Sequence, residues 1–153
     1  MLDDEMHQAI GEVTVAAASL EYQLTFLAAV ARHEDDEWIR QTLGKVGEAR
    51  RQIDALIEDV AEGAFLQELK RLRRDAFAVL DDRNVIVHSV AMLDRGEDGA
   101  VFWTFWHPRS DAEARIDVGQ LREHARDLGA VAARSLSISH LANEWRIGRE
   151  VGG

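Results

Sequence analysis

Three residues that stand close together in the chain, Arg83, Asn84 and His88, combine side chains that can cleave a phosphodiester bond. An unperturbed imidazole has a pKa of about 6.5, so His88 can accept or donate a proton at neutral pH. A guanidinium keeps its charge, and Arg83 can therefore stabilise the negative charge of a pentacoordinate phosphorane. These residues predict phosphodiester chemistry that needs no metal ion and no other cofactor.

Arg83 occupies a position where the helical pattern otherwise places apolar side chains, because it follows Ala76 by seven residues and Leu69 by fourteen. A permanent cation at such a position needs a counter-charge or an anionic ligand. Two alternatives stay open. Arg83 forms a buried ion pair with Glu21 or Asp82, or it binds an anion that a ligand supplies.

Arg83 and His88 would not share a face of a continuous helix, since five steps of about 100° separate their side chains by about 140°. The two groups can form one site in two ways. Either the helix breaks around the β-branched run Val85-Ile86-Val87, or a twofold axis brings the two side chains together with their copies from a second subunit.

The run Arg83-Asn84-Val85-Ile86-Val87-His88 resembles the motif of the HEPN domains. That motif is an Arg, four to six further residues and a His, with a polar residue, often Asn, directly after the Arg. An Arg and a His at this spacing are expected by chance in a chain of this composition, so the two residues alone are a weak match. The Asn directly after the Arg makes the match specific, because the chain contains only two Asn.

The resemblance implies a mainly α fold, a bundle of about four long helices with the motif near the end of one of them. It also implies a metal-independent endoribonuclease that acts on RNA as a homodimer, with the motifs of both protomers facing one composite active site. Many HEPN proteins are toxins with a cognate antitoxin protein, and others act in phage defence, for example in abortive infection or in CRISPR effectors.

The resemblance also assigns a role to each motif residue. His88 corresponds to the acid/base that works on the ribose 2′-hydroxyl, which gives a 2′,3′-cyclic phosphate and a 5′-hydroxyl. Arg83 corresponds to the clamp on the phosphate, and Asn84 would orient one of these groups or bind the phosphate. Glu21 would pair with Arg83, unless it is a surface residue.

Lys70, Arg73 and Arg74 lie upstream of the motif and are candidates to guide the RNA backbone. The alternative is that this basic run is a solvated helix face. One position departs from the family pattern, because toxins paired with nucleotidyltransferase antitoxins carry a Tyr two residues after the His, where this chain has Val90. We therefore expect no control through modification of such a Tyr.

The composition predicts one globular domain over residues 1–148, followed by a frayed tail at 149–153. The chain has 153 residues, 46% of them hydrophobic, with one Pro and no Cys. Folding hides roughly 68–70% of the surface of an extended chain of this size, so a core can form without disulfides or a structural metal. The lack of Cys excludes disulfides, thiolate zinc sites and Cys nucleophiles.

The net charge of −10 disfavours a nucleic acid partner if it is spread evenly, but the charge is uneven. Residues 63–95 carry 5 acidic and 6 basic residues, which makes this segment the least repulsive for an anion. No apolar run approaches the roughly 18 residues that span a bilayer, and the acidic start of the chain does not resemble a signal peptide. We therefore expect a cytoplasmic protein with no membrane association.

Apolar residues at three- and four-residue spacing predict helices over residues 4–32 and 64–87, and a last helix over about 119–146. A further apolar stripe runs from Ile39 to Val60, where Gly44 and Gly47 predict a bend or fraying. Between the third and last helices, residues 90–107 read as a β-hairpin around the loop 95–99. The predicted fold is thus a helical bundle with an inserted hairpin.

The second strand of the predicted hairpin contains Phe102, Trp103, Phe105 and Trp106, so both of its faces are apolar. One face would pack on helices, and the other is either buried in the monomer or meets a partner chain. This pattern supports an alternative function. The chain would then be a non-catalytic helical module that dimerises or docks on a partner, with Arg83 and His88 forming a buried polar network.

Overall fold

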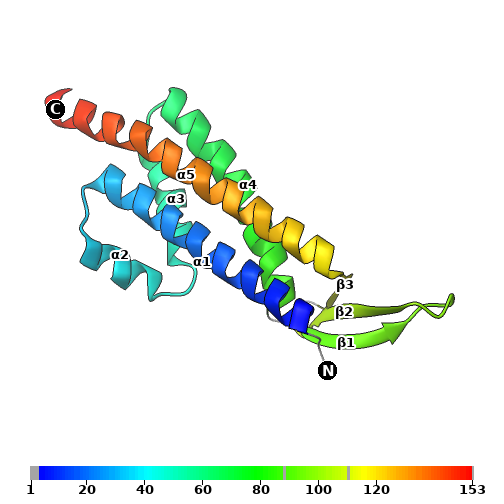
Figure 1. Cartoon of the computed structure of the whole chain (residues 1–153). Coiled ribbons are helices and arrows are strands. Elements are labelled where there is room, and N and C mark those ends of the chain that lie inside the picture. Colours follow the sequence, from blue (N-terminus) through cyan, green and yellow to red (C-terminus); the bar gives the residue numbers. More distant parts are fainter. Residues whose placement is uncertain (1–3, 88, 110, 153) are drawn as a thin grey trace. The chain divides into compact units, whose positions relative to one another are not determined.

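The computed structural model describes residues 4–87, 89–109 and 111–152. Within these residues the chain is mainly helical, as predicted, with five helices and one three-stranded sheet (Figure 1). The chain divides into two compact units, each built from segments that are far apart in the sequence. The first comprises Met1–Ala17 and Ala78–Leu128, and the second comprises Ala18–Phe77 and Gly129–Gly153. The single domain over 1–148 stays a prediction.

The first long helix, α1 (Asp4–Arg32), has the predicted bounds. Its apolar residues at three- and four-residue spacing are buried, and acidic residues in the first turn and Arg32 in the last turn suit the helix dipole. The motif helix, α4 (Ala64–Val87), also has the predicted bounds. Both predictions are confirmed because each helix buries a continuous stripe whose period of 3.6 residues is visible in the sequence.

The stripe from Ile39 to Val60 forms two helices, α2 (Asp36–Leu43) and α3 (Glu48–Asp59), instead of one bent helix. The chain stops being helical between Gly44 and Gly47, and Gly47 has a φ of 76°, a left-handed conformation that glycine adopts without steric cost. Asp35 caps α2, because its Oδ1 accepts a hydrogen bond of 2.9 Å from the backbone N of Trp38.

The predicted hairpin is confirmed as β1 (Val90–Arg95) and β2 (Val101–His107), which pair antiparallel with Val90 opposite Trp106. A third strand, β3 (Ala112–Arg115), pairs antiparallel with the other edge of β2 and was not predicted. Three of its four residues, in the sequence Ala-Glu-Ala-Arg, are Ala or Glu, which are depleted in strands, so pairing with the edge of β2 and not intrinsic preference explains this strand.

The turn between β1 and β2 is closed by its own hydrogen bonds. The backbone N of Gly96 donates to the carbonyl of Ala100 at 2.8 Å, and the N of Gly99 donates to the carbonyl of Gly96 at 2.9 Å. Gly99 has a φ of 81°, which the loop needs to reverse direction.

The last helix, α5 (Val118–Gly152), begins with a capping box. The N of Gln120 donates to Asp117 Oδ1 at 2.7 Å, and the N of Asp117 donates to Gln120 Oε1 at 2.9 Å. The helix continues to Gly152, beyond the predicted end near 146 and through most of the predicted frayed tail. An ion pair of 2.9 Å from Arg146 to Glu150, one turn apart, supports these last turns.

Ion pairs and ring contacts join the helical segments of the second unit. Arg32 pairs with Asp59 at 2.9 Å, and Arg134 on α5 pairs with Asp75 on α4 at 2.9 Å. The rings of Phe65 and Trp145 lie 5.7 Å apart. The largest fully buried side chains of this unit are Leu20, Leu24, Leu27, Ile53, Leu56, Leu69 and Leu72. This apolar core holds the first part of α4 in place.

By length and composition alone, α1 is apolar enough to cross a membrane, which corrects the expectation that no segment approaches this limit. Its charge-poor interior is rich in Ala, Leu and Val around a single acidic residue, Glu21. The buried core helix of a soluble protein meets the same criterion, and α1 carries a regular stripe of buried residues, so the observation is weak evidence for a membrane span.

Candidate functional site

The motif starts in the last turns of α4. This helix is continuous through Val87, so Arg83 and Asn84 lie about 100° apart around its axis. The β-branched run Val85-Ile86-Val87 is helical and forms the last residues of α4. The two predicted ways to form the site, a helix break around this run and a second subunit, both stay predictions. The predicted catalytic residue His88 lies outside the described residues.

Arg83 and Asn84 are both half-buried, and the Nε atom of Arg83 is shielded from solvent. Asp82 is exposed and forms no ion pair with any residue that the structure describes, so it does not supply the buried counter-charge considered for Arg83. Glu21 belongs to the second unit and Arg83 to the first, and their pairing stays a prediction.

A hollow of about 340 Å³ lies against α4 beside the motif. One wall is the face of α4 formed by Asp82, Val85 and Ile86, whose spacing of three and four residues places them together. The remaining lining comes from Glu113 on β3, Ile116, and Gln120 and His124 on α5. The lining thus combines three apolar side chains with two carboxylates, an amide and an imidazole.

Glu113 and His124 were not singled out as site residues by the sequence. Glu113 belongs to a strand that was not predicted, and His124 reaches the hollow from the first turns of α5, about forty residues after the motif. The Nε2 atom of His124 is buried and has no hydrogen-bond partner within the described residues. Only the fold brings these groups together, so spacing along the chain could not reveal them.

The three predicted RNA-binding residues differ in their surroundings. Lys70 is exposed. Arg73 forms an ion pair with Asp54 on α3, and its guanidinium lies 4.7 Å from the centre of the Phe77 ring. Arg74 pairs with Asp75 at 2.9 Å. Two of the three positive charges therefore already face carboxylates, and a phosphate would have to compete with them.

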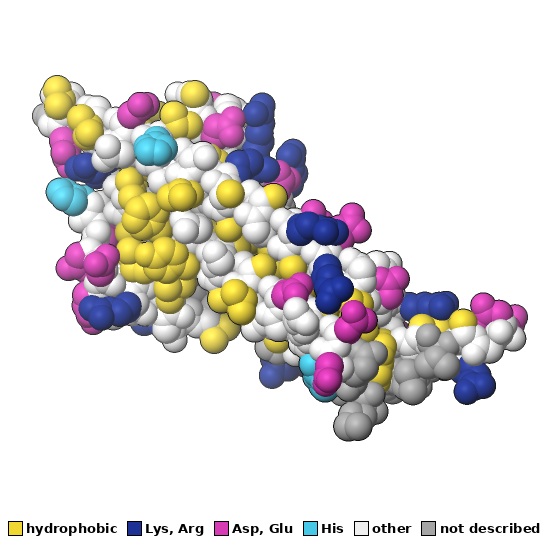
Figure 2. Space-filling model, viewed as in Figure 1, with side chains coloured by type: hydrophobic (Ala, Val, Ile, Leu, Met, Phe, Trp, Pro, Cys, Tyr) yellow, Lys and Arg dark blue, Asp and Glu magenta, His cyan; other side chains and the backbone are white. Residues whose placement is uncertain are grey.

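The ion pair between Arg74 and Asp75 shifts the pKa values of both side chains. The hydrogen bond to Asp75 raises the pKa of Arg74, and the hydrogen bond from Arg74, followed by that from Arg134, lowers the pKa of Asp75. Figure 2 shows similar mixing on a larger scale, because Lys and Arg side chains lie among Asp and Glu side chains over the visible face.

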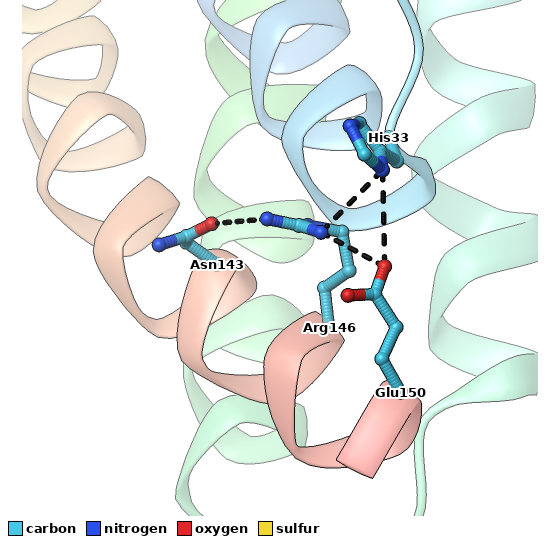
Figure 3. Close-up of polar contacts among 4 residues, drawn as sticks. All are labelled: His33, Asn143, Arg146 and Glu150. Carbon is cyan, nitrogen blue, oxygen red and sulfur yellow. Dashed lines mark hydrogen bonds and ion pairs between the residues drawn. The ribbon is translucent and has the colours of Figure 1, made fainter. Parts of the chain in front are cut away.

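A second polar cluster lies in the second unit, where α5 meets the end of α1 (Figure 3). Arg146 donates to Glu150 and to the side-chain oxygen of Asn143, both at 2.9 Å, and its Nη1 lies 3.5 Å from His33 Nδ1. His33 has a φ of 56°, and the backbone N of Glu34 bonds to the carbonyl of Ala29, as at a helix C-terminus. The cluster ties two helix ends together.

The sequence predicts no metal centre, and in the part of the chain that the structure describes no three His, Asp or Glu side chains form a group that could hold a metal ion. No protein-family model, curated protein or solved structure matches the chain.

Proposed function

We propose that the chain is a metal-independent endoribonuclease of the HEPN type, with a helical bundle of that family's arrangement. The observation that carries the proposal is the position of the motif. Arg83 and Asn84 lie in the last turns of a helix of 24 residues that ends at Val87, directly before His88 in the sequence. The resemblance to HEPN domains implies this placement, near the end of a long helix.

In the proposed reaction, His88 removes the proton of a ribose 2′-hydroxyl, and the oxygen attacks the adjacent phosphorus. The bond from phosphorus to the 5′-oxygen breaks, and that oxygen leaves with a proton donated by an acid. The products are a 2′,3′-cyclic phosphate and a 5′-hydroxyl. Arg83 binds the non-bridging oxygens of the phosphorane, and Asn84 orients the phosphate or the imidazole.

The reaction needs a general base and a general acid on different oxygens of the phosphate, whereas one chain supplies a single motif histidine. We therefore assign one role to the His88 of each protomer in a homodimer. The helix α4 ends at Val87, the last residue of the β-branched run, so a break around this run stays the alternative way to bring Arg83 and His88 of one chain together.

The substrate is RNA, and Lys70, Arg73 and Arg74 contact its backbone in this proposal. Such an enzyme would act in the cytoplasm as a toxin or a phage-defence effector, with a cognate antitoxin protein as a partner. Expression of the unaccompanied chain would then arrest growth, and expression of the Arg83→Ala or His88→Ala variants would not.

The direct test is incubation of the purified protein with a structured RNA and a tRNA pool in the presence of EDTA. We expect cleavage that leaves cyclic phosphate ends, and its loss in His88→Ala and Arg83→Ala. His140→Ala and Arg71→Ala are matched controls, because both residues are exposed and outside the motif, and they should keep full activity. Cleavage retained in both motif variants would contradict the proposal.

The non-catalytic module remains the second candidate, and the half-buried position of Arg83 favours it. If Arg83 serves a buried polar network, Arg83→Ala strands its partner and lowers the free energy of unfolding by roughly 3–5 kcal/mol. A melting curve that Arg83→Ala leaves unchanged would count against this candidate.

A further inference from the structure

The hollow beside the motif is lined by both acidic and apolar side chains. Asp82 and Glu113 place two carboxylates in its lining, and the apolar part of the lining consists of Val85, Ile86 and Ile116. Two negative charges disfavour a phosphate, whereas the apolar side chains favour a flat, uncharged group. Carboxylates accept hydrogen bonds and do not donate them. The hollow therefore suits an apolar ring whose edge carries hydrogen-bond donors.

Among the uncharged parts of RNA, the nucleobases have this form, and their edges differ. Guanine presents two adjacent donors, N1–H and the 2-amino group, beside the acceptor O6. One carboxylate can accept from both donors, while the imidazole of His124 donates to O6. Adenine and cytosine place an acceptor beside their amino group, and uracil has one donor between two acceptors, so none of them offers a carboxylate two adjacent donors.

We infer that this hollow is a guanine-binding pocket, in which Glu113 accepts from the Watson–Crick edge of the base and His124 donates to O6. The inference rests on the proposed function, since it assigns the pocket to a base next to the bond that is cut. Two further observations support it. Asp82 precedes Arg83 in the chain, and His124 Nε2 lacks a hydrogen-bond partner within the described residues, which a ligand would supply.

The test measures binding of free nucleosides to the full chain, which does not depend on cleavage. Guanosine, inosine, adenosine and uridine are titrated while the histidine ring signals are followed by NMR, with the His124 signal assigned from its loss in His124→Gln. We expect guanosine to shift the His124 signal, inosine to bind more weakly because it lacks the 2-amino group, and adenosine and uridine to leave the signal unchanged.

Glu113→Gln should weaken guanosine binding about 10- to 100-fold, because an amide no longer accepts from two donors. Glu123→Gln is the matched control, since Glu123 is an exposed acid next to His124 that does not line the hollow, and it should bind guanosine like the wild type. Asp82→Asn provides a second lining variant in case Glu113→Gln does not fold, and it should also bind guanosine more weakly.

The outcomes separate the pocket from the nuclease. Three results would overturn the inference of a guanine pocket, even when RNA is cleaved. The four nucleosides bind alike, none of them binds, or Glu113→Gln and Asp82→Asn both bind guanosine like the wild type. If guanosine binds selectively but RNA is not cleaved, the guanine pocket stands and the proposed function fails. If both hold, cleavage should occur next to guanine in an RNA of mixed sequence.

Discussion

Asp75 accepts contacts from two arginines, Arg74 on its own helix and Arg134 on α5, each at 2.9 Å. These hydrogen bonds lower the pKa of Asp75. A carboxyl whose pKa is lower in the folded than in the unfolded chain stabilises the fold above its unfolded pKa, which is about 3.9 for Asp. This stabilisation is lost as the pH falls through the lowered pKa of the folded state.

We therefore expect the free energy of unfolding to decrease as the pH is lowered below about 4. The decrease should be less steep in Asp75→Asn. Urea unfolding at several pH values measures this slope. Asp127→Asn is a control, because Asp127 is an exposed acid on α5, and it should keep the slope of the wild type. Equal slopes for Asp75→Asn and the wild type would contradict the prediction.

At the same scale, the sequence identifies only those site residues that are neighbours along the chain. Arg83 and Asn84 were found because they are adjacent and follow a helical stripe. Glu113 and His124 converge on the hollow from β3 and α5, and each is an ordinary polar residue in its own segment. Their proximity is a property of tertiary packing, which spacing in one sequence does not encode.

At the scale of the helices, replacing either of two glycines by Ala should change the free energy of unfolding, and the two changes should have opposite signs. Gly129 lies within α5, and a Cβ added there would have no atom within 4 Å. Gly129→Ala should raise the free energy of unfolding by about 0.5–1 kcal/mol, because Ala restricts the unfolded chain and favours the helix.

Gly47 precedes α3 with a φ of 76°, so Gly47→Ala should lower the free energy of unfolding by about 1–2 kcal/mol. Chemical unfolding of the two variants beside the wild type measures both changes. A stabilising effect of Gly47→Ala would mean that the chain between α2 and α3 adopts another conformation without cost.

The same helices show what a sequence can and cannot predict about the elements. The bounds of α1 and α4 were predicted correctly, because each buries one stripe along its length. The break at Gly44 and Gly47 was predicted only as a bend or fraying. Helix propensity gives the free-energy cost of a glycine in a helix, but it does not show where the chain leaves the helix. The strand β3 depends on pairing with β2, which no local pattern records.

For the whole molecule, the central expectation is that two copies share one active centre. If both copies of His88 are needed, an equal mixture of wild type and His88→Ala that has exchanged subunits should keep about one quarter of the wild-type cleavage rate. If each protomer acts alone, about one half should remain. A mixture of wild type and Arg71→Ala, treated in the same way, should keep the full rate.

The turn between β1 and β2 also has a practical consequence. Its own hydrogen bonds close it, and the residues from Glu97 to Ala100 are exposed. Foreign residues are tolerated best at exposed tips of this kind. An epitope or a fluorescent dye introduced between Glu97 and Asp98 would leave α4 and α5 unaltered, so this internal position gives an attachment point for immobilising or imaging the molecule without a fusion at either end.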